Sequence, residues 1–434
     1  MHLTLGLLVL SLGVLPVAVA QTGHVLNGVG PIDQSWSGAG MAAPRDGLAA
    51  LHWNPAAIAT LDATQLDVSL QLMFPTTDLA STIETGAMGP DAPPVRLSGT
   101  TASDTGPFPI PAVGFVYRPA HGRSTFGISA LGVGGFGVNY AASDPTTADG
   151  NPITFPQEAG GFGALRSSFS LFQVAPTYAF AFNDRLSFGL APTLNVGMLE
   201  VAPFPATNPD QNGYPDGPRA TALGFGAQLG FHYATDAGLT AGISVKTPQF
   251  FQDFDFAYAD RTFSYNLDYP LIASVAAAYS GIDRLTLVAD VRYLDFANTD
   301  GFQAAAFDET GAVTGFGWES IWVAAVGLEY DVTDRLPVRL GYAYNENPIR
   351  DDVAFFNVAA PAIVQHHLSA GFSYLVNARV MASAAVQYAP RNEVTSAMQS
   401  PMMIPMTGQS SVPGTTVTSE LSTLTAVVGV SYRF

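Results

Sequence analysis

The sequence lacks cysteine and has few charged residues. Without cysteine the chain can form neither a disulfide nor a thiolate metal site, although this absence does not by itself decide the compartment. Asp, Glu, Lys and Arg make up 12% of the 434 residues, about half the usual share for a soluble globular domain. So little charge is better explained if lipid, and not water, surrounds the middle of the protein.

Basic residues are scarcer than acidic ones. The sequence has 17 basic and 35 acidic residues, a formal charge of −18, and its only lysine is Lys246. Phosphate binding depends on clustered Lys and Arg, so we expect no nucleic-acid partner.

No stretch has the composition of a membrane-spanning helix. Residues 124–143 are uncharged, but five of them are glycine, which favours a bent strand over a helix. Residues 167–183 contain Pro176 in their middle, which argues against a helix there too. If the chain crosses a membrane, we expect it to do so with strands.

The first 20 residues have the features of a secretory signal peptide. Residues 3–15 form an apolar run that is too short to span a bilayer, and Ala18, Val19 and Ala20 form an A-x-A cleavage site before Gln21. A membrane anchor is the alternative, and the length of the run argues against it. We therefore expect an exported protein from which residues 1–20 are removed.

Short polar turns recur between apolar or alternating runs. Their markers are Asp184, Asp236, Asp283, Asp334 and Asn377, which are 52, 47, 51 and 43 residues apart. Longer linkers rich in Gly, Pro, Asp and Asn separate one tight turn from the next. Short turns on one rim and long loops on the other are typical of an outer-membrane β-barrel.

The runs between the turns alternate as the strands of such a barrel require. In residues 284–294, apolar side chains occupy every second position, and Thr286, Asp290 and Arg292 share the other face. The last strand alternates in the same way and ends in Phe434. A terminal aromatic strand resembles the signal read by the machinery that inserts outer-membrane barrels, although an ordinary amphipathic strand would also fit.

The fold class predicted is all-β: a transmembrane antiparallel β-barrel of about 14 strands, an even number as in single-chain bacterial barrels. Both termini then lie on the periplasmic rim and the long loops, including residues 76–108, face outward. A lumen this wide cannot be filled by wall side chains alone, so it is a channel or is plugged. The expected strands are 63–75, 109–119, 124–141, 168–182, 185–201, 221–234, 239–252, 266–280, 284–296, 317–331, 335–345, 366–376, 379–390 and 419–434.

Residues 21–61 precede the first strand, do not alternate and are too apolar to lie in water, so we expect them inside the barrel. Within them SGAGMA is followed by Asp46 and then by Asn54, Pro55 and Ala56. These motifs, with LGYAYNENP at 340–348 and HLSAGFSY at 367–374, resemble the FadL-type transporters of fatty acids and other hydrocarbons across the outer membrane. The resemblance covers the mature chain and implies a hatch at 21–61 and a barrel at 62–434.

The resemblance also implies a route. A hydrophobic molecule is caught among extracellular loops, passes to an apolar pocket over the hatch and leaves sideways at a kink in the third strand, without an energy source. Phe136 and Gly137 match the kink motif, whereas Gly135 stands where the family often has a polar residue or proline. A glycine cluster is also where a strand bulges most easily. The alternative is that these glycines only ease packing against the hatch.

The capture site is less well defined by the sequence. Phe250, Phe251, Phe254, Phe256 and Tyr258 crowd one outer strand end. They fit either a groove for an alkyl chain or the interfacial aromatic girdle of any such barrel.

Two polar residues have alternative interpretations as well. Lys246 lies near these phenylalanines and is either a partner for a carboxylate or a solvated surface lysine. Asn54 is better explained as a turn former in the hatch than as a ligand contact.

Several functions are alternatives to the transport of apolar molecules. A general diffusion porin for small polar solutes is the main alternative, but a hatch would block it. An outer-membrane lipase would need a Ser and His pair; His367 and Ser369 share a strand face without a placed third partner. His366 and His367 point to opposite faces and make a poor metal site. A structural or adhesive barrel remains a further alternative.

The expected protein is therefore a transporter and not an enzyme, with no cofactor and no metal. Its partners would be a hydrophobic small molecule, the lipid and lipopolysaccharide of the bacterial outer membrane, and the barrel-insertion machinery through Phe434. A monomer is expected because a hatch-gated barrel needs no second subunit.

Overall fold

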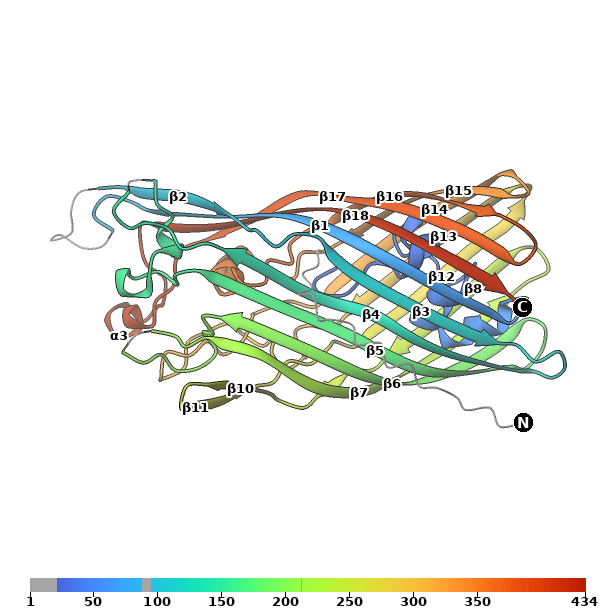
Figure 1. The fold of residues 1–434 in the computed structure, drawn as a ribbon, viewed down its shortest axis with the longest axis horizontal. Coiled ribbons are helices and arrows are strands. Elements are labelled where there is room, and N and C mark those ends of the chain that lie inside the picture. The colour runs from blue at the N-terminus through green and yellow to red at the C-terminus, as the bar shows by residue number, and fades with distance from the viewer. Residues whose placement is uncertain (1–21, 88–94, 148, 212) are drawn as a thin grey trace, which may run out of the picture.

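The computed structural model describes residues 22–87, 95–147, 149–211 and 213–434. Fourteen antiparallel strands close into a barrel, and the ring is completed by the pairing of β1 with β18 from Gln65↔Arg433 to Ile83↔Thr415. Each strand pairs with its neighbours in sequence, as in an up-and-down barrel (Figure 1). The predicted fold class and strand number are confirmed. The predicted leader lies outside the described residues.

The barrel strands have the following bounds: β1 (Gln65–Ile83), β3 (Phe108–Tyr117), β4 (Ser124–Tyr140), β5 (Leu165–Ala181), β6 (Leu186–Ala202), β7 (Gly217–Ala234), β8 (Leu239–Lys246), β12 (Ile272–Ile282), β13 (Leu285–Leu294), β14 (Ile321–Thr333), β15 (Leu336–Asn345), β16 (His366–Leu375), β17 (Val380–Ser396) and β18 (Thr415–Arg433). Four further strands are short: β2 (Leu97–Ala102) pairs with β1, β9 (Phe250–Phe251) pairs with β7, and β10 (Phe254–Tyr258) and β11 (Arg261–Tyr265) form a separate hairpin.

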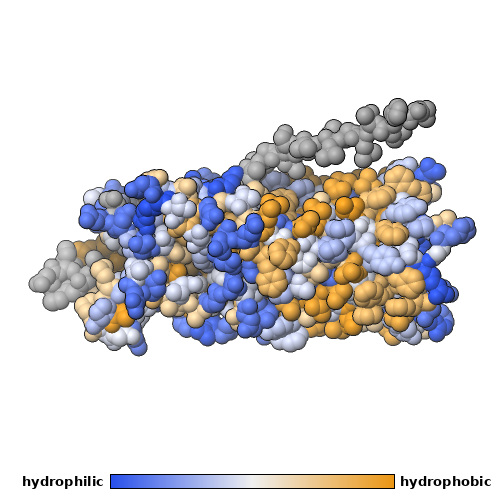
Figure 2. All heavy atoms as spheres, turned by 90° about the horizontal axis from the view of Figure 1, so that it is seen from below, coloured by the Kyte–Doolittle hydropathy of each residue, from blue (hydrophilic) through white to orange (hydrophobic). Residues whose placement is uncertain are grey.

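The outer surface of the barrel carries an apolar belt. On β13, Leu287 and Val291 point outward and are 42% and 46% exposed, whereas Asp290 and Arg292 point into the lumen and are buried. The same alternation runs around the barrel, and the exposed apolar side chains gather toward the end with the short turns (Figure 2). Lipid around this belt and a polar lumen account for both faces of each strand. Among the described residues, no helix is long and apolar enough to cross a membrane.

The two rims differ as the sequence predicted. The turns at Asp184, Asp236, Asp283, Asp334 and Asn377 are short and lie at the same end of the barrel as the C-terminus (Figure 1). At the opposite end the strands extend beyond the apolar belt and are joined by long loops that carry the short helices η2 (Pro152–Thr154), η3 (Gln157–Ala159), η4 (Asp351–Asn357), η5 (Pro401–Met403) and α3 (Ile404–Thr407).

Strand lengths are where the sequence-based prediction was least accurate. β1 continues to Ile83, where a long outer loop from residue 76 was expected. This outer part is mostly polar, and it pairs with β18 and β2 above the belt, so lipid imposes no apolar outward face on it. β8 ends at Lys246, six residues before the expected end. Proline at 248 cannot donate to the ladder, so the pairing with β7 is interrupted there and resumes at β9.

Candidate functional site

The N-terminal segment, residues 22–61, lies inside the barrel toward the short-turn end (Figure 1). It contains two short helices and a 3-10 helix: α1 (Gly30–Ser35), α2 (Gly47–Trp53) and η1 (Pro55–Thr60). The side chain of Asp46 caps α2 by accepting a hydrogen bond from the Ala49 amide at 3.0 Å. Nearly all of the segment is buried, because polar and apolar wall side chains surround it on every side.

Asn54 forms a turn and also attaches the segment to the wall. Its Oδ1 accepts a hydrogen bond from the Ala56 amide at 3.0 Å, and its Nδ2 donates to the Phe231 carbonyl oxygen at 3.0 Å. This agrees with the interpretation of Asn54 as a turn former. Glycines in the barrel wall leave space for this turn. A side chain at Gly189 would collide with Pro55 and Ala56, and a side chain at Gly230 would collide with Asn54.

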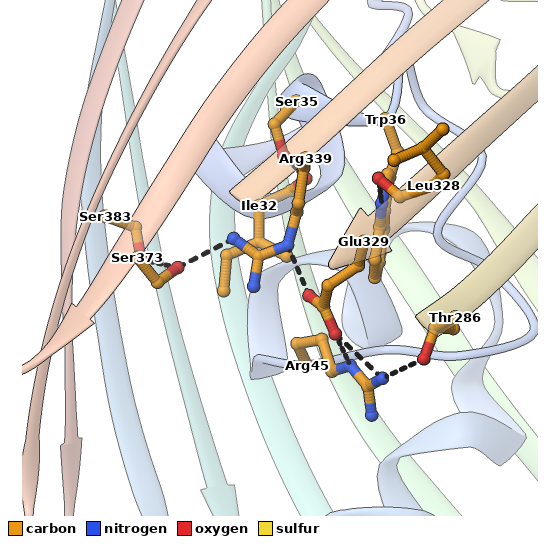
Figure 3. A network of polar contacts seen from close by, with 10 residues as sticks. All are labelled: Ile32, Ser35, Trp36, Arg45, Thr286, Leu328, Glu329, Arg339, Ser373 and Ser383. Carbon is orange, nitrogen blue, oxygen red and sulfur yellow. Dashed lines mark hydrogen bonds and ion pairs between the residues drawn. The ribbon is translucent and has the colours of Figure 1, made fainter. Parts of the chain in front are cut away.

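A polar network joins the N-terminal segment to β14 and β15 (Figure 3). Glu329 lies between two guanidinium groups: its Oε2 accepts from Nε of Arg339 at 2.6 Å, and its Oε1 accepts from Nη2 of Arg45 at 2.9 Å. Glu329 and Arg339 are buried, whereas Arg45 is partly exposed. Beside this network the indole of Trp36 donates to the Leu328 carbonyl oxygen at 3.1 Å.

A second polar cluster lies deeper in the lumen. The carboxylate of Asp33 accepts hydrogen bonds from the amides of Val29 and Gly40 and, at 2.8 Å, from the indole of Trp53. The guanidinium of Arg292 stacks over the Trp53 ring at 3.7 Å and forms an ion pair with Asp290. The contacts of Asp33 and Arg292 therefore join the N-terminal segment to β13 through buried charged groups.

The Glu329 network predicts a large stability effect. Glu329→Gln removes the negative charge and leaves Arg339 buried without an ionic partner, so we expect a loss of about 3 kcal/mol in the free energy of unfolding. The measurement is urea unfolding of the protein in lipid vesicles. Glu319→Gln, which breaks an exposed pair with Arg350, is the matched control and is expected to cost less than about 1 kcal/mol. Equal effects of the two variants would contradict the conclusion that Glu329 stabilises the protein as the ionic partner of buried Arg339.

β4 contains a bulge at its glycine cluster, as the sequence predicted. Its pairing with β5 steps from Gly132↔Phe172 to Gly134↔Leu171, so Val133 has no partner on β5. Pairing between β3 and β4 also stops here, at Ala112↔Leu131. Beyond Leu131, toward the long-loop end, β3 and β4 are not paired, so the barrel wall is interrupted there.

Two prolines of β3 explain the interruption. Pro109 and Pro111 have no amide hydrogen to donate to β4. The side chain of Ile110, between them, lies against Gly132 and narrows the gap. The role of β3 at this opening was not predicted from the sequence, although the alternating prolines in FPIPAV could have indicated it.

The start of the N-terminal segment pairs with the bulge. The Leu26 amide donates to the Val133 carbonyl oxygen and the Gly135 amide donates to the His24 carbonyl oxygen, both at 3.1 Å. A side chain at Gly134 would collide with the His24 carbonyl oxygen. The glycines therefore allow both the bulge and the close approach of residues 24–26, so the two sequence-based interpretations of the cluster are compatible.

A row of phenylalanine rings leads from the outer loops to the bulge. Phe251 stacks on Phe254 with ring centroids 6.1 Å apart, Phe254 lies 6.3 Å from Phe169, and Phe169 lies 5.3 Å from Phe136 on β4. All four rings are buried. We call them the phenylalanine row. Phe169 was not a candidate in the sequence, because one aromatic in a strand carries no signal of its neighbours.

The predicted capture residues are divided by the structure. Phe250 points outward and is 52% exposed, whereas Phe254 and Phe256 are completely buried. Phe256 stacks with Phe204 and Phe263. Of the five predicted residues, Phe250 and Tyr258 are exposed, whereas the buried Phe251, Phe254 and Phe256 form neither a girdle nor an open groove.

Asp268 stabilises the loop segment that contains Phe251. Its carboxylate accepts a hydrogen bond from the Phe251 amide at 2.7 Å. Partial burial raises the pKa of Asp268 to about 6. The hydrogen bond opposes this shift, and the nearby carboxylates of Asp300 and Asp253 add to it.

Lys246 is not a solvated surface lysine, and that interpretation was wrong. It is 2% exposed and points into the lumen, where it donates to Oε1 of Gln173 at 3.2 Å. Gln173 in turn hydrogen-bonds with Asn195 and with the buried side chain of Gln249. Alternation on β8 places Lys246 on the lumen side, because its neighbour Val245 points outward and is 44% exposed.

Charge is distributed unevenly along the barrel axis. Among the described residues, the long-loop segments and the adjoining strand ends have 23 acidic and six basic residues, whereas the remaining 11 acidic and 11 basic residues cancel. The excess of negative charge among the described residues therefore lies at the outer end of the protein.

His367 and Ser369 both face the N-terminal segment or loops and not each other. His367 Nε2 shares a hydrogen bond with Asn345 Oδ1 at 2.8 Å, and Ser369 Oγ shares one with Ser37 Oγ at 2.7 Å. His366 is exposed and His367 buried, as predicted for adjacent strand residues. Among the described residues no group of three or more His, Asp or Glu side chains is placed to hold a metal ion.

A closed fourteen-stranded barrel with an apolar belt and a lumen filled by its own N-terminal segment defines a class: outer-membrane β-barrel channels with an internal plug. The sequence profile of the family described as "Outer membrane protein transport protein (OMPP1/FadL/TodX)" matches residues 23–434. The chain belongs to this family and is a protein of the bacterial outer membrane.

Solved structures show the same fold. The toluene transporter TodX of P. putida is 17% identical, with a TM-score of 0.65 over 94% of this chain and 99% of that one. The toluene transporter TbuX of Ralstonia pickettii is 18% identical, with a TM-score of 0.65 over 94% and 99%. A Pseudomonas aeruginosa FadL homologue is 16% identical, with a TM-score of 0.68 over 95% and 100%. Comparison with curated protein sequences gives no match.

Proposed function

We propose that the protein is a channel for passive uptake of long-chain fatty acids or other hydrophobic compounds across the outer membrane, with residues 22–61 as its hatch. The observation that carries the proposal is the phenylalanine row, which runs from the loop strand β9 to the bulge in β4. Buried rings along a lumen suit an apolar passenger and not a hydrated one. Membership of a transport family that includes TodX supports the same conclusion.

Capture would take place at the outer end of the row. The hairpin β10–β11 and the loop around Phe204 stack their rings against each other at centroid distances of 4.8 to 5.3 Å. The two segments are also joined by exposed hydrogen bonds from Arg261 to Asn208, which would open when the rings part around an apolar molecule. Phe251 and Phe254 would then receive it and pass it along Phe169 to an apolar pocket above the hatch.

Exit would take place sideways at the bulge. Gly135, Phe136 and Gly137 line β4 where it has no pairing with β3. A hydrophobic molecule that leaves here enters the apolar belt directly and never crosses the polar seat of the hatch. The hatch residues Asn54, Pro55 and Ala56 would keep water and ions out without touching the passenger.

The remaining partners are also part of the proposal. The acidic outer end would meet lipopolysaccharide through divalent cations, since both surfaces are anionic. Phe434 is 66% exposed at the end of β18 and is available to the insertion machinery. A single copy suffices, because the route lies within one barrel.

The test is uptake by cells that lack their own transporters, with and without this protein. We expect a labelled long-chain fatty acid, a labelled monoaromatic hydrocarbon, or both to enter faster when the protein is present, and a labelled sugar to enter at the background rate. Entry of sugar without either apolar probe would establish the general porin in its place.

The phenylalanine row makes a prediction within the same assay. Phe254→Ala opens a gap between Phe251 and Phe169, and we expect uptake of the transported probe to fall about fivefold because the apolar path is interrupted. Phe250→Ala is the matched control: this ring points outward, so uptake should be unchanged. A larger loss with Phe250→Ala would place the path outside the barrel.

A further inference from the structure

A polar cavity lies at the short-turn end of the barrel, between the wall and the N-terminal segment (Figure 1). Its volume is about 370 Å³. Ala59 and Thr60, at the end of η1, form one side, and the lumen-facing Ser187 and His232 form part of another. The β3–β4 and β5–β6 turns close the rest. Because these turns belong to the periplasmic rim, a molecule reaches this cavity from the periplasm. We call it the periplasmic cavity.

Three arginines line the periplasmic cavity. Arg118 and Arg123 flank the β3–β4 turn, and Arg185 belongs to the β5–β6 turn. Arg185 forms an ion pair with Asp236, whereas neither Arg118 nor Arg123 forms one with any described residue. Asp184 is the one carboxylate among the described residues that line the cavity. Two unpaired guanidinium groups therefore face a single carboxylate, which leaves a local excess of positive charge in a chain whose formal charge is −18.

Backbone carbonyls hold both unpaired guanidinium groups in place. Nη1 of Arg118 donates to the carbonyl oxygens of Ala59 at 2.5 Å and of Leu61 at 2.9 Å. Nη1 of Arg123 donates to the Phe182 carbonyl oxygen at 2.7 Å. A guanidinium has five N–H donors and a carbonyl does not neutralise its charge, so Nε and Nη2 of each arginine remain available to an anion. Because these side chains are already anchored, less rotamer freedom is lost when a ligand binds.

We propose that the periplasmic cavity binds the phosphate group of a small soluble molecule, with Arg118 and Arg123 as its direct ligands. The planar fork of a guanidinium matches a pair of phosphate oxygens, and two such groups suit a doubly charged phosphate monoester. The cavity is within the size range of small-molecule sites, so it has room for more than a phosphate. The polar side chains of Asn183 and Ser187 in its lining suit the hydroxyl groups of a sugar phosphate.

The distribution of charge favours a ligand from the periplasm. Acidic residues are in excess at the outer end, whereas acidic and basic residues cancel in the rest of the described chain. A soluble anion is therefore repelled at the outer mouth and not at the periplasmic one. A phospholipid headgroup is the other source of phosphate at this rim. The buried, lumen-facing Ser187 and His232 place the cavity within the mouth of the barrel, away from lipid, and this favours the soluble source.

A bound phosphate would connect the N-terminal segment to the wall. Arg118 is attached to the carbonyls at the end of this segment, and Arg123 is attached to the carbonyl of Phe182, directly after β5. An anion held by both guanidinium groups bridges these two attachments. Its binding therefore stabilises the closed arrangement of the segment in the barrel, by mass action on the folded state. This inference goes beyond the proposed uptake and does not depend on which molecule the channel carries.

The test is isothermal titration calorimetry of glucose 6-phosphate with the purified full-length protein in phosphatidylcholine nanodiscs. We expect saturable binding of glucose 6-phosphate and no binding of glucose. Arg118→Gln and Arg123→Gln each remove one charged donor and should weaken binding about tenfold. Asp184→Asn removes the carboxylate from the lining and should tighten binding about threefold. A gain of affinity cannot result from misfolding, so this variant keeps the test decisive if an arginine variant folds poorly.

Arg379→Gln is the matched control. Arg379 lies in the β16–β17 turn at the same rim, is exposed, forms no ion pair with a described residue and does not line the cavity. Its replacement should leave the affinity for glucose 6-phosphate unchanged. Equal losses in Arg379→Gln and Arg123→Gln, or no loss in either arginine of the cavity, would overturn the site.

A second lipid composition distinguishes the two sources of phosphate. In nanodiscs that contain phosphatidylglycerol, an accessible anionic headgroup would compete with glucose 6-phosphate for the same arginines. We expect the affinity to change less than about threefold, as screening of surface charge allows. A loss of binding in these nanodiscs that Asp184→Asn does not reverse would assign the cavity to a lipid headgroup and overturn the soluble ligand.

Discussion

Deletion of residues 35–56 is expected to convert the closed barrel into an open pore. This stretch contributes α2, Trp36 and the Asn54 turn, all buried in the lumen. A ring of fourteen strands is too wide for its own wall side chains to fill, so ions and small polar solutes would pass where the segment was. We expect permeability to a labelled sugar in proteoliposomes to rise at least about tenfold.

A loop deletion provides the control for this experiment. Removal of residues 400–410, at the outer tip of the long loop before β18, shortens the chain without touching the lumen at the level of the belt. That variant should remain as impermeable as the wild type. A hatch deletion that stays impermeable to ions would mean that the loops, and not residues 22–61, close the barrel.

Deletion of Val133 is expected to close the wall and stop transport. Before the bulge Leu131 faces the lumen, and after it Phe136 does, so removal of the one unpaired residue keeps both side chains on their present faces. The ladder between β4 and β5 then becomes continuous, and the opening is narrowed. We expect uptake of the transported apolar probe to fall about tenfold or more, because the sideways path is lost.

Val133→Ala is the control that tests the Val133 side chain while the bulge is kept. This variant keeps the extra residue and its backbone bonds, so its uptake should equal that of the wild type. Circular dichroism and resistance to unfolding in sodium dodecyl sulfate check that both barrels are folded. Unchanged uptake after deletion of Val133 from a folded barrel would show that the passenger leaves by another path.

Much of the barrel could be predicted because its signals are local. On β13 the alternation of Leu287, Asp290 and Val291 follows from lipid on one side and a filled lumen on the other. Turns at Asp184 or Asn377 can be recognised because a tight turn limits which residues fit. The outer part of β1 was not predicted because it lies above the lipid, where no lipid contact requires apolar side chains at every second position.

The candidate site was predictable only in part. Glycines at 134 and 135 indicate a bulge in the sequence itself, because only small residues allow the backbone to leave the ladder there. The partners of that bulge could not be predicted. Pro109 on the neighbouring strand and His24 at the start of the chain reach it through the closure of the barrel and the fold of the hatch.

By itself the sequence determined the membrane barrel, the sidedness of its turns and loops, the internal position of residues 22–61 and the bulge in β4, since each follows from composition or from a pattern over a few neighbouring residues. Only the tertiary structure decided that Lys246 and Phe254 point inward and that Arg118 and Arg123 line one cavity with the end of η1. These placements depend on contacts between residues distant in sequence, which form only when fourteen strands close around the segment.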